Sequence, residues 1–349
     1  MKRKYAAILI IVLVVGTGSF LWNRFINPDP ASAELKQMVT DSASSTFSVK
    51  KWEEADKYSK KAMKFKEKDE LMSSGNEFAV TGVKLKAPYG IACLSEGILL
   101  ADHGESCLYL IDYSGNLVRK IGELGNGPNQ FQKPTGCTYH NGYYYVIDSG
   151  NKRIVILDRQ FNYTKELKLP KSERESEKEF TDIAINDKGD IYISGSYLYD
   201  SGLYRYNLEK DKFENVQKYF YGSLKEFGGE VYAVDQFRIY VDFEKKEITG
   251  GAGPNALWRL DGRNIKKLSN LPAGLNAGSF ELLRDNLIIC SPFHSAVMAF
   301  NMNDGEYISN IYEVDKMDYK TYASIYGSDL YITEPEKGKI LKISLEKLQ

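Results

Sequence analysis

Carboxylate side chains recur at one place in a repeated pattern along the chain. Six short apolar segments each end in an acidic or small residue, and they occupy residues 98–102, 144–148, 191–195, 231–235, 287–291 and 330–334. Four of them end in a carboxylate, namely Asp102, Asp148, Asp235 and Glu334. Converging carboxylates could bind Ca²⁺ or a catalytic metal ion. They could instead cap the turn that follows each segment, as Asp commonly does. Because all four share one repeat position, we favour turn capping and predict no metal ligand and no cofactor.

Histidines and nucleophile motifs give little support for catalysis. The chain has three histidines, of which His103 and His294 follow two of the apolar segments, whereas His140 lies in a different turn. Two histidines make at most part of a metal site. The sequence contains no Gly-x-Ser-x-Gly motif, and the glycine-rich residues 250–255 lack the Lys-Ser/Thr of a phosphate loop. These residue types therefore favour a binding protein over an enzyme.

The spacing of the segments predicts the elements that position these residues. A second strand follows each segment, at 107–112, 153–158, 202–207, 256–261, 296–301 and 339–344, and the segments recur every 40 to 56 residues. This interval is typical of four-stranded propeller blades. Only five outer strands follow the strand pairs, and residues 78–85 precede the first blade without a partner. We therefore predict an all-β fold, a six-bladed β-propeller in which strand 78–85 closes the last blade and leaves no open sheet edge.

The second repeat carries the fullest motif. It reads Gly-x-Gly-Pro-x-x-Phe at 125–131, Pro-x-Gly at 134–136 and Asp-Ser-Gly-Asn-x-Arg at 148–153. This pattern resembles the NHL repeat, and the resemblance implies a six-bladed propeller over about residues 78–349. NHL-like propellers include binding scaffolds and a few metal-dependent lyases and lactonases, so the fold does not choose the function. The amidating lyases among them use three zinc-binding histidines, and the position of His140 does not match that set.

The first 30 residues predict a membrane segment. Lys2, Arg3 and Lys4 precede an apolar run over 6–22, which is long enough for a short spanning helix. Basic residues before the run keep the start in the cytoplasm and place the remainder outside. We expect a single-pass signal-anchor in the cell membrane with an extracytoplasmic propeller, or a secreted protein if cleavage follows Ala33. The net charge of −1 argues against a general nucleic-acid binder.

Residues 31–76 predict a polar linker and a charged helical stalk between the segment 1–30 and the propeller at 77–349. Ser48 is a candidate cap for a helix over 49–72. This lysine-rich helix could contact anionic lipid or serve as a spacer packed on the propeller, and the acidic residues within it favour the spacer. The four cysteines form no Cys-x-x-Cys pair, and we expect buried thiols at Cys93, Cys107, Cys137 and Cys290.

Loop lengths indicate a binding face. The connections between second and third strands, and those between blades, are longer than the turns on the opposite face, and loops on a rigid frame often carry function. The longest connection, 236–255, alternates apolar and charged residues and predicts a hairpin flap that either covers the binding face or pads the fourth blade. The candidate ligand-binding residues are His103, Arg153, Arg238, Tyr240, Phe293 and His294. We expect a binding or scaffold module for a protein, peptide or glycan ligand; the alternative is a Ca²⁺- or Zn²⁺-dependent hydrolase or lyase of the lactonase or amidating-lyase kind.

Overall fold

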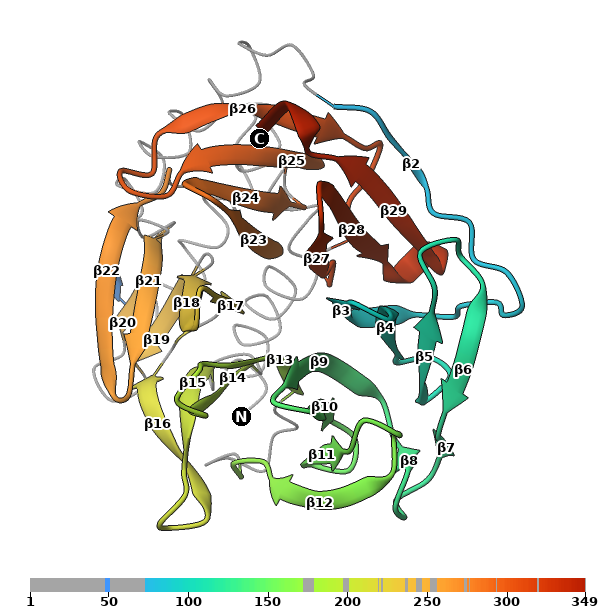
Figure 1. Ribbon diagram of the computed structural model, residues 1–349. Coiled ribbons are helices and arrows are strands. Elements are labelled where there is room, and N and C mark those ends of the chain that lie inside the picture. The colour runs from blue at the N-terminus through green and yellow to red at the C-terminus, as the bar shows by residue number, and fades with distance from the viewer. Residues whose placement is uncertain are drawn as a thin grey trace, which may run out of the picture.

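Six antiparallel sheets of four strands each are arranged around a central axis (Figure 1). The computed structural model describes residues 48–50 and 73–348, except 172–178, 197–200, 219, 221, 236–237, 243–246, 252–255, 273–274, 276, 293 and 319. Within these residues each blade is a meander that runs from the axis outward. The six-bladed all-β propeller expected from the repeat is therefore confirmed.

The first three blades are continuous in sequence. Blade 1 consists of β3 (Pro88–Leu94), β4 (Gly97–Asp102), β5 (Cys107–Ile111) and β6 (Leu117–Ile121). Blade 2 consists of β9 (Pro134–His140), β10 (Tyr143–Asp148), β11 (Arg153–Leu157) and β12 (Tyr163–Lys168), and the link before it pairs β7 (Glu123–Leu124) with β8 (Gln130–Phe131). Blade 3 consists of β13 (Glu179–Ile185), β14 (Ile191–Ser196), β15 (Gly202–Asn207) and β16 (Lys212–Lys218).

The other three blades include one insertion and the ring closure. Blade 4 consists of β17 (Gly222–Phe227), β18 (Glu230–Asp235), β21 (Ala256–Asp261) and β22 (Asn264–Asn270). Blade 5 consists of β23 (Ser279–Leu283), β24 (Asn286–Ser291), β25 (Ala296–Asn301) and β26 (Tyr307–Glu313). Blade 6 consists of β27 (Ala323–Tyr326), β28 (Asp329–Glu334), β29 (Lys339–Ser344) and, from the N-terminal side, β2 (Gly75–Glu77).

Strand β2 closes the ring, but it is not the strand predicted from the sequence. Asn76 lies opposite Lys342 in an antiparallel pair, so the closing strand lies just before the predicted 78–85. Phe78 makes the last backbone hydrogen bond of this strand pair, from its N–H to the Ile340 carbonyl oxygen at 2.8 Å. The chain then leaves the sheet, and Val80, Val83 and Leu85 pack over the seam between blades 6 and 1. The apolar alternation that suggested a strand therefore reflects packing across this seam.

Buried side chains fill the spaces between neighbouring blades. Leu99 and Leu110 of blade 1, for example, pack with Val146 and Val155 of blade 2, and all but Leu110 have no exposed surface. Since the second and third strands of a blade contact a neighbour on each side, their residues are buried on both faces and read as continuous apolar runs. This packing explains why those strands gave the strongest signal in the sequence.

Among the acidic residues at strand ends, Asp102 caps the turn that follows it, as expected, whereas Glu334 makes no side-chain capping hydrogen bond. Asp102 accepts hydrogen bonds from the backbone N–H groups of Lys86, Ala87, Gly104 and Glu105 at 2.8–3.1 Å. It therefore stabilises the hairpin that follows and also ties down the incoming chain. Within the described ranges, no group of three or more His, Cys, Asp or Glu side chains is placed to hold a metal ion.

A small extra sheet joins the insertion to a segment near the N-terminus. Strand β1 (Ser48–Lys50) pairs in parallel with β20 (Glu247–Gly251), which pairs in antiparallel fashion with β19 (Arg238–Asp242). The predicted hairpin in 236–255 is thus confirmed. The prediction that Ser48 caps a helix is wrong, because residues 48–50 form a strand; residues 51–72 of that helix lie outside the described residues.

The predicted membrane segment at 6–22 also lies outside the described residues. In the part of the chain that the structure describes, no helix is long and apolar enough to cross a membrane.

Candidate binding site in the central channel

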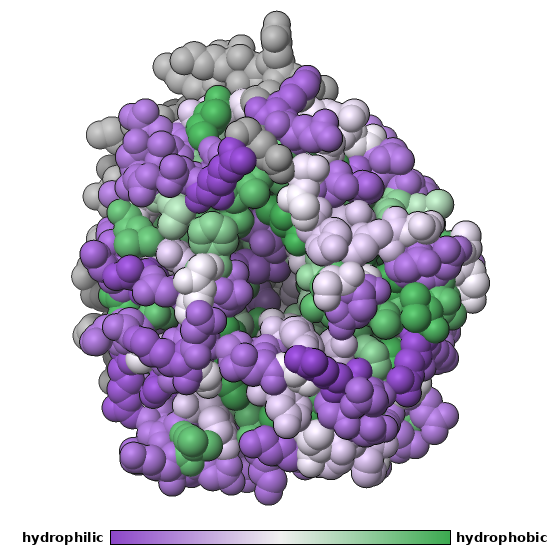
Figure 2. All heavy atoms as spheres, viewed as in Figure 1, coloured by the Kyte–Doolittle hydropathy of each residue, from purple (hydrophilic) through white to green (hydrophobic). Residues whose placement is uncertain are grey.

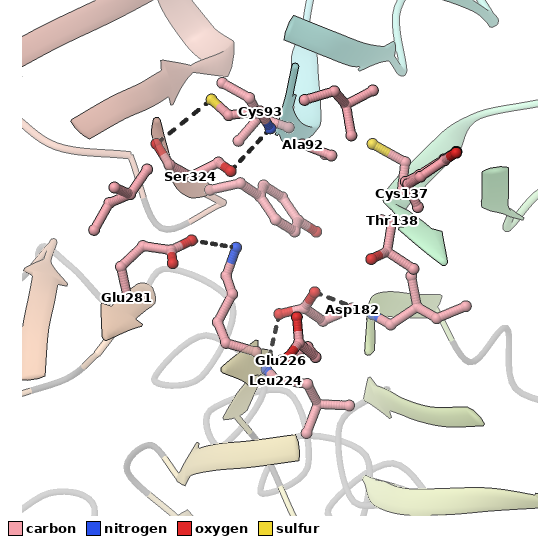
Figure 3. A pocket seen from close by; sticks show the side chains of 18 of the residues that line it. Ala92, Cys93, Cys137, Thr138, Asp182, Leu224, Glu226, Glu281 and Ser324 are labelled. Atoms are coloured by element: carbon pink, nitrogen blue, oxygen red, sulfur yellow. Dashed lines mark hydrogen bonds and ion pairs between the residues drawn. The ribbon is translucent and has the colours of Figure 1, made fainter. Parts of the chain in front are cut away.

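The innermost strands of the six blades surround a channel that contains a cavity of about 390 Å³. Figure 3 shows side chains from several blades that converge on this space. Volumes of this size are typical of small-molecule sites.

The innermost strands approach one another closely: a Cβ atom added to Gly90 would lie 2.1 Å from the Thr135 carbonyl oxygen of the next blade. A Cβ atom added to Gly136, the last residue of the Pro-x-Gly motif, would likewise lie 2.7 Å from the Thr181 carbonyl oxygen.

The two faces of the disc differ around this channel. We call the face with the short turns between first and second strands, such as residues 95–96 and 228–229, the turn face, and the opposite one the loop face. The exposed residues Ser95, Glu96 and Glu226 line the cavity, so the cavity opens towards the turn face. The disc face drawn in Figure 2 is hollowed near its centre, with hydrophilic residues around the hollow.

Lys225 on β17 lines the cavity. Its Nζ is 2.8 Å from Glu281 Oε1 on β23 and donates a hydrogen bond to the Ala323 carbonyl oxygen at 2.5 Å. These contacts connect three consecutive blades. Burial alone would lower the pKa of Lys225, but the neighbouring carboxylates of Glu281 and Asp182 outweigh it and raise the pKa above its usual value. Lys225 therefore carries a positive charge at neutral pH.

Asp182 on β13 is a buried carboxylate in the same wall, with 8% of its surface exposed. It accepts hydrogen bonds from the backbone N–H groups of Leu224 and Ile183, at 2.9 and 3.0 Å. Burial raises the pKa of Asp182 to about 6, although the charge of Lys225 acts in the opposite direction. Burial also raises the pKa of Glu281. The cavity thus holds carboxylates that are only partly compensated by one ammonium group.

Two thiols that line the cavity are unreactive. Burial raises the pKa values of Cys93 and Cys137 to about 12, so both are protonated at neutral pH. A thiol nucleophile needs a lowered pKa, which this environment does not provide. All four cysteines are free, as expected, and three are buried while Cys93 is partly exposed. The arrangement is suited to binding a polar group rather than to nucleophilic attack.

The loop-face end of the channel is crossed by contacts between opposite blades. The Tyr322 hydroxyl, beside β27, donates a hydrogen bond of 3.0 Å to the Thr181 carbonyl oxygen of blade 3. Lys320 forms an ion pair of 2.9 Å with Glu179, again between the chain before blade 6 and blade 3. Blades 3 and 6 lie on opposite sides of a six-bladed ring, so both contacts span the axis. The ends of the channel are therefore unequal, with the cavity mouth on the turn face.

Two of the predicted ligand-binding residues are histidines with separate surroundings. His103, in the hairpin after β4, stacks on Tyr89 with ring centroids 4.2 Å apart. Burial lowers the pKa of His103, so it is neutral at neutral pH. His294 is buried in the hairpin between β24 and β25, on blade 5. Neither residue lines the cavity.

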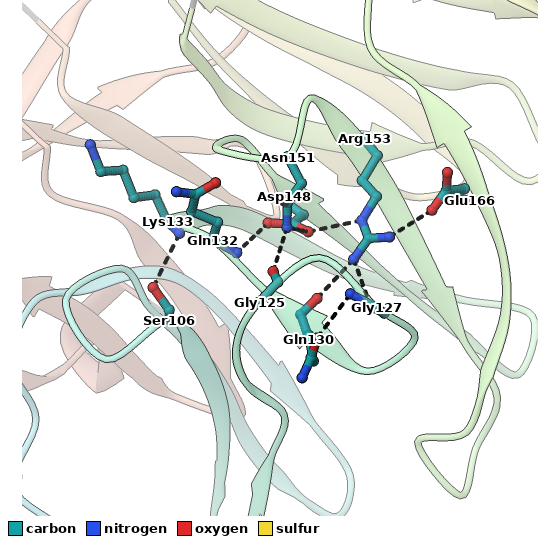
Figure 4. Close-up of polar contacts among 10 residues, drawn as sticks. All are labelled: Ser106, Gly125, Gly127, Gln130, Gln132, Lys133, Asp148, Asn151, Arg153 and Glu166. Atoms are coloured by element: carbon teal, nitrogen blue, oxygen red, sulfur yellow. Dashed lines mark hydrogen bonds and ion pairs between the residues drawn. The ribbon is translucent and has the colours of Figure 1, made fainter.

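Arg153 forms ion pairs and hydrogen bonds within blade 2 and with the link that precedes it. Its guanidinium contacts Asp148 Oδ2 at 2.9 Å and Glu166 Oε2 at 2.7 Å. It also donates to the carbonyl oxygens of Gly127 and Gln130, each at 2.9 Å (Figure 4). Asp and Arg of the Asp-Ser-Gly-Asn-x-Arg motif therefore hold the link β7–β8 against blade 2.

The other three predicted site residues are described less fully. Arg238 and Tyr240 belong to β19, of which the structure describes the backbone only, and Phe293 lies outside the described residues.

The charged cavity residues were missed at the level of the sequence, although a signal was present. Lys225 and Glu281 occupy equivalent positions in the inner strands of blades 4 and 5. Lys225 pairs with Tyr232 and Glu281 with Ile288, and each of these partners lies three residues before the end of the second strand of its blade. Asp182 interrupts the inner strand of blade 3. A charged residue in an innermost strand of a propeller faces neighbours that are distant in sequence, and an alignment of the blades would have shown that Lys225 and Glu281 share one position.

Comparisons with known proteins agree with this fold. A family model described as a 6-bladed beta-propeller matches residues 82–236. No curated protein matches the sequence. Similar solved structures include virginiamycin B lyase from Staphylococcus aureus, with 16% identity over 78% of this chain and 99% of that chain at a TM-score of 0.53. A luciferin-regenerating enzyme has 11% identity over 78% of this chain and 95% of that chain, at a TM-score of 0.56.

A further neighbour, provisionally named a gluconolactonase, has 10% identity over 80% of this chain and 95% of that chain, with a TM-score of 0.56. At these identities the similarity establishes the propeller fold alone.

Proposed function

We propose that this chain is a ligand-binding propeller that takes part of its ligand into the central cavity from the turn face. The observation that carries the proposal is the cavity itself: about 390 Å³, with Asp182, Lys225 and Glu281 in a wall made by several blades. Convergent polar groups in a preformed concave site are typical of binding sites. The ligand is a protein, peptide or glycan, of which one side chain, chain end or sugar unit enters the cavity while the remainder lies on the turn face.

The proposed position differs from the loop face favoured by loop length. Cross-channel contacts of Tyr322 and Lys320 occupy the loop-face end, which supports access from the other side. The flap at 236–255 and the residues predicted there remain a proposal for a separate contact surface. We interpret the motif at 125–158 as an NHL-like repeat whose role is to fasten the link before blade 2.

A cavity-filling variant tests the binding site. Thr138 lines the cavity on β9 and is partly exposed, so Thr138→Trp places a large ring into the space. Saturation-transfer NMR with a library of small polar fragments should show binding to the unmodified protein and loss of that binding in the variant. Lys165→Trp, on the exposed outer strand β12, is the matched control and should bind as the unmodified protein does. Equal fragment binding by both variants, or no binding to any form, would contradict the proposal.

We also propose that the propeller lies outside the cytoplasm and is tethered to the cell membrane by residues 6–22. The basic start and the apolar run support this location. Protease added to intact spheroplasts should digest the propeller or its linker, while a cytoplasmic marker protein survives. Complete protection of the propeller until the membrane is lysed would refute the location.

A metal-dependent hydrolase or lyase is the alternative function. It predicts stoichiometric Ca²⁺ or Zn²⁺ in the purified protein, and loss of that metal in His294→Ala. Elemental analysis of full-length protein, dialysed in detergent solution, distinguishes the alternatives. Metal at one equivalent would replace the binding proposal by the enzymatic one.

A further inference from the structure

We infer that the central cavity selects a ligand group with a positive charge, a primary ammonium or a guanidinium such as the end of a lysine or arginine side chain. The inference rests on the proposed function, because it takes the cavity to be the binding site, and it adds the chemical class of the group that enters.

The first argument is the excess of negative charge in the wall. Glu96, Asp182, Glu226 and Glu281 line the cavity together with a single cation, Lys225, so the formal charge of the lining is −3. Charges inside a cleft with walls of low dielectric constant focus the potential on that space. Glu96 and Glu226 are exposed at the mouth, where they can attract a cation before it reaches the deeper carboxylates.

The second argument is that Asp182 forms no direct ion pair, although the charge of Lys225 is near enough to lower its pKa. It is more than nine-tenths buried, and its hydrogen bonds come from backbone N–H groups alone. Among the described residues, no Lys, Arg or His lies within ion-pair distance of it. A buried carboxylate that touches no cation is costly, and Lys225 offsets this cost only from a distance, so a cationic ligand in direct contact with Asp182 would reduce it further.

The third argument is that the cavity already holds one ammonium group. Lys225 Nζ is bound by a carboxylate oxygen of Glu281 and by the carbonyl oxygen of Ala323. Only Oε1 of Glu281 is used in this contact; within the described part of the chain, Oε2 accepts no hydrogen bond. The wall therefore offers a second ammonium or guanidinium the same kind of oxygen ligands, from Glu281, Asp182 and Glu226.

The test uses three probes of equal length and different charge: 1,6-diaminohexane, 1,6-hexanediol and adipate. Isothermal titration calorimetry on full-length protein in detergent, at pH 7.5 and constant ionic strength, should show binding of the diamine. We expect the diol and the dianion to bind at least tenfold more weakly or not at all. Thr138→Trp should abolish diamine binding, which locates it in the cavity.

Two acidic variants separate local recognition from general attraction. Glu226→Gln removes an exposed carboxylate at the mouth and should weaken diamine binding by about threefold to tenfold. Glu209→Gln removes an exposed carboxylate from a turn of blade 3 that does not line the cavity, and it should leave the affinity unchanged. Equal weakening by both variants would overturn the inference, since it would show non-specific attraction.

Other results separate this inference from the function on which it rests. If the diol or adipate binds as tightly as the diamine and Thr138→Trp abolishes that binding, the cavity is a binding site but is not selective for cations, and only the inference fails. If CaCl₂ binds in the cavity and the diamine does not, the inference is also overturned. If polar fragments bind in the cavity and none of the three probes does, the inference fails while the proposed function stands.

Discussion

Two clusters of buried charge in this propeller use the same residue types to different effect. In blade 2, Asp148 and Arg153 form a network in which the guanidinium binds two carboxylates and two carbonyl oxygens. In the central channel, Lys225 is paired with Glu281, while Asp182 has hydrogen bonds but, among the described residues, no direct ion pair. In the first cluster the carboxylates and the guanidinium are fully paired by groups of the protein itself, whereas in the second the carboxylates outnumber their cationic partners.

The difference supports the proposal that the channel cluster serves binding, whereas the blade 2 cluster stabilises the fold. A saturated network fixes the position of a link and gains nothing from a ligand. A network with too few cations holds negative charge that a ligand can neutralise. The free-energy cost of this charge is tolerable at the axis, because the cavity keeps the carboxylates close to solvent. The following predictions test this contrast, beginning with the largest expected effect.

Replacing Arg153 should cause the greatest loss of stability. Arg153→Ala leaves Asp148, which has no exposed surface, without its cation, and we expect the free energy of unfolding to fall by about 3–5 kcal/mol. Urea unfolding followed by tyrosine fluorescence measures the change. Arg263→Ala is the control, since Arg263 pairs with Glu214 at the surface and should change stability by less than about 1 kcal/mol. Similar losses for both variants would remove the distinction drawn for blade 2.

Replacing Asp182 should change how stability depends on pH. Because the pKa of Asp182 is about 6 in the folded protein and about 4 in an unfolded chain, the folded state binds this proton more tightly. Its contribution is therefore greatest below about pH 4 and declines as the pH rises through about 6. Relative to Asp182→Asn, the unmodified protein should lose about 2–3 kcal/mol between pH 4 and pH 7.

A surface carboxylate supplies the control for this pH dependence. The pKa of Asp261 is lowered by its hydrogen bond to Lys188, so Asp261→Asn should alter the pH profile less and with the opposite sign. Urea unfolding at four pH values measures both profiles. Parallel profiles for Asp182→Asn and the unmodified protein would show that Asp182 titrates normally.

Removing the ammonium of the cavity should have a moderate effect. Lys225→Met keeps most of the apolar stem but leaves Glu281 unpaired, and we expect a loss of about 1–2 kcal/mol, below the value for fully buried pairs because the cavity opens to solvent. The loss should be greater at pH 8 than at pH 5, since the remaining carboxylates can take up protons at the lower pH. A loss as large as that of Arg153→Ala would mean that the two clusters are equally structural.

The smallest effect concerns the thiols beside the cavity. Cys93 and Cys137 have pKa values of about 12, so iodoacetamide at pH 8 should leave the folded protein unlabelled over minutes. Mass spectrometry should detect four labels only after unfolding in urea. Rapid labelling of Cys93 in the folded protein would contradict the environment described for the cavity wall.

The sequence by itself determined most of the fold. Apolar segments with constant spacing and polar ends predicted six blades, the pairing within them and the turn-capping role of Asp102, because strand periodicity and turn chemistry are local properties. It also predicted the closure of the ring, but it assigned the closing strand to 78–85. The apolar residues there pack between blades, and a local sequence pattern cannot distinguish a segment packed in this way from a strand.

Only the tertiary structure formed the cavity that we propose as the binding site. Loop length pointed to the loop face, yet the side chains that cross the channel, Tyr322 and Lys320, come from the chain before blade 6 and meet blade 3 on the other side of the axis. Asp182, Lys225 and Glu281 lie on three different blades and become neighbours only when the ring forms. Burial and mutual proximity then set their charges, and neither quantity exists in a linear sequence, because both depend on which segments the closed ring brings together.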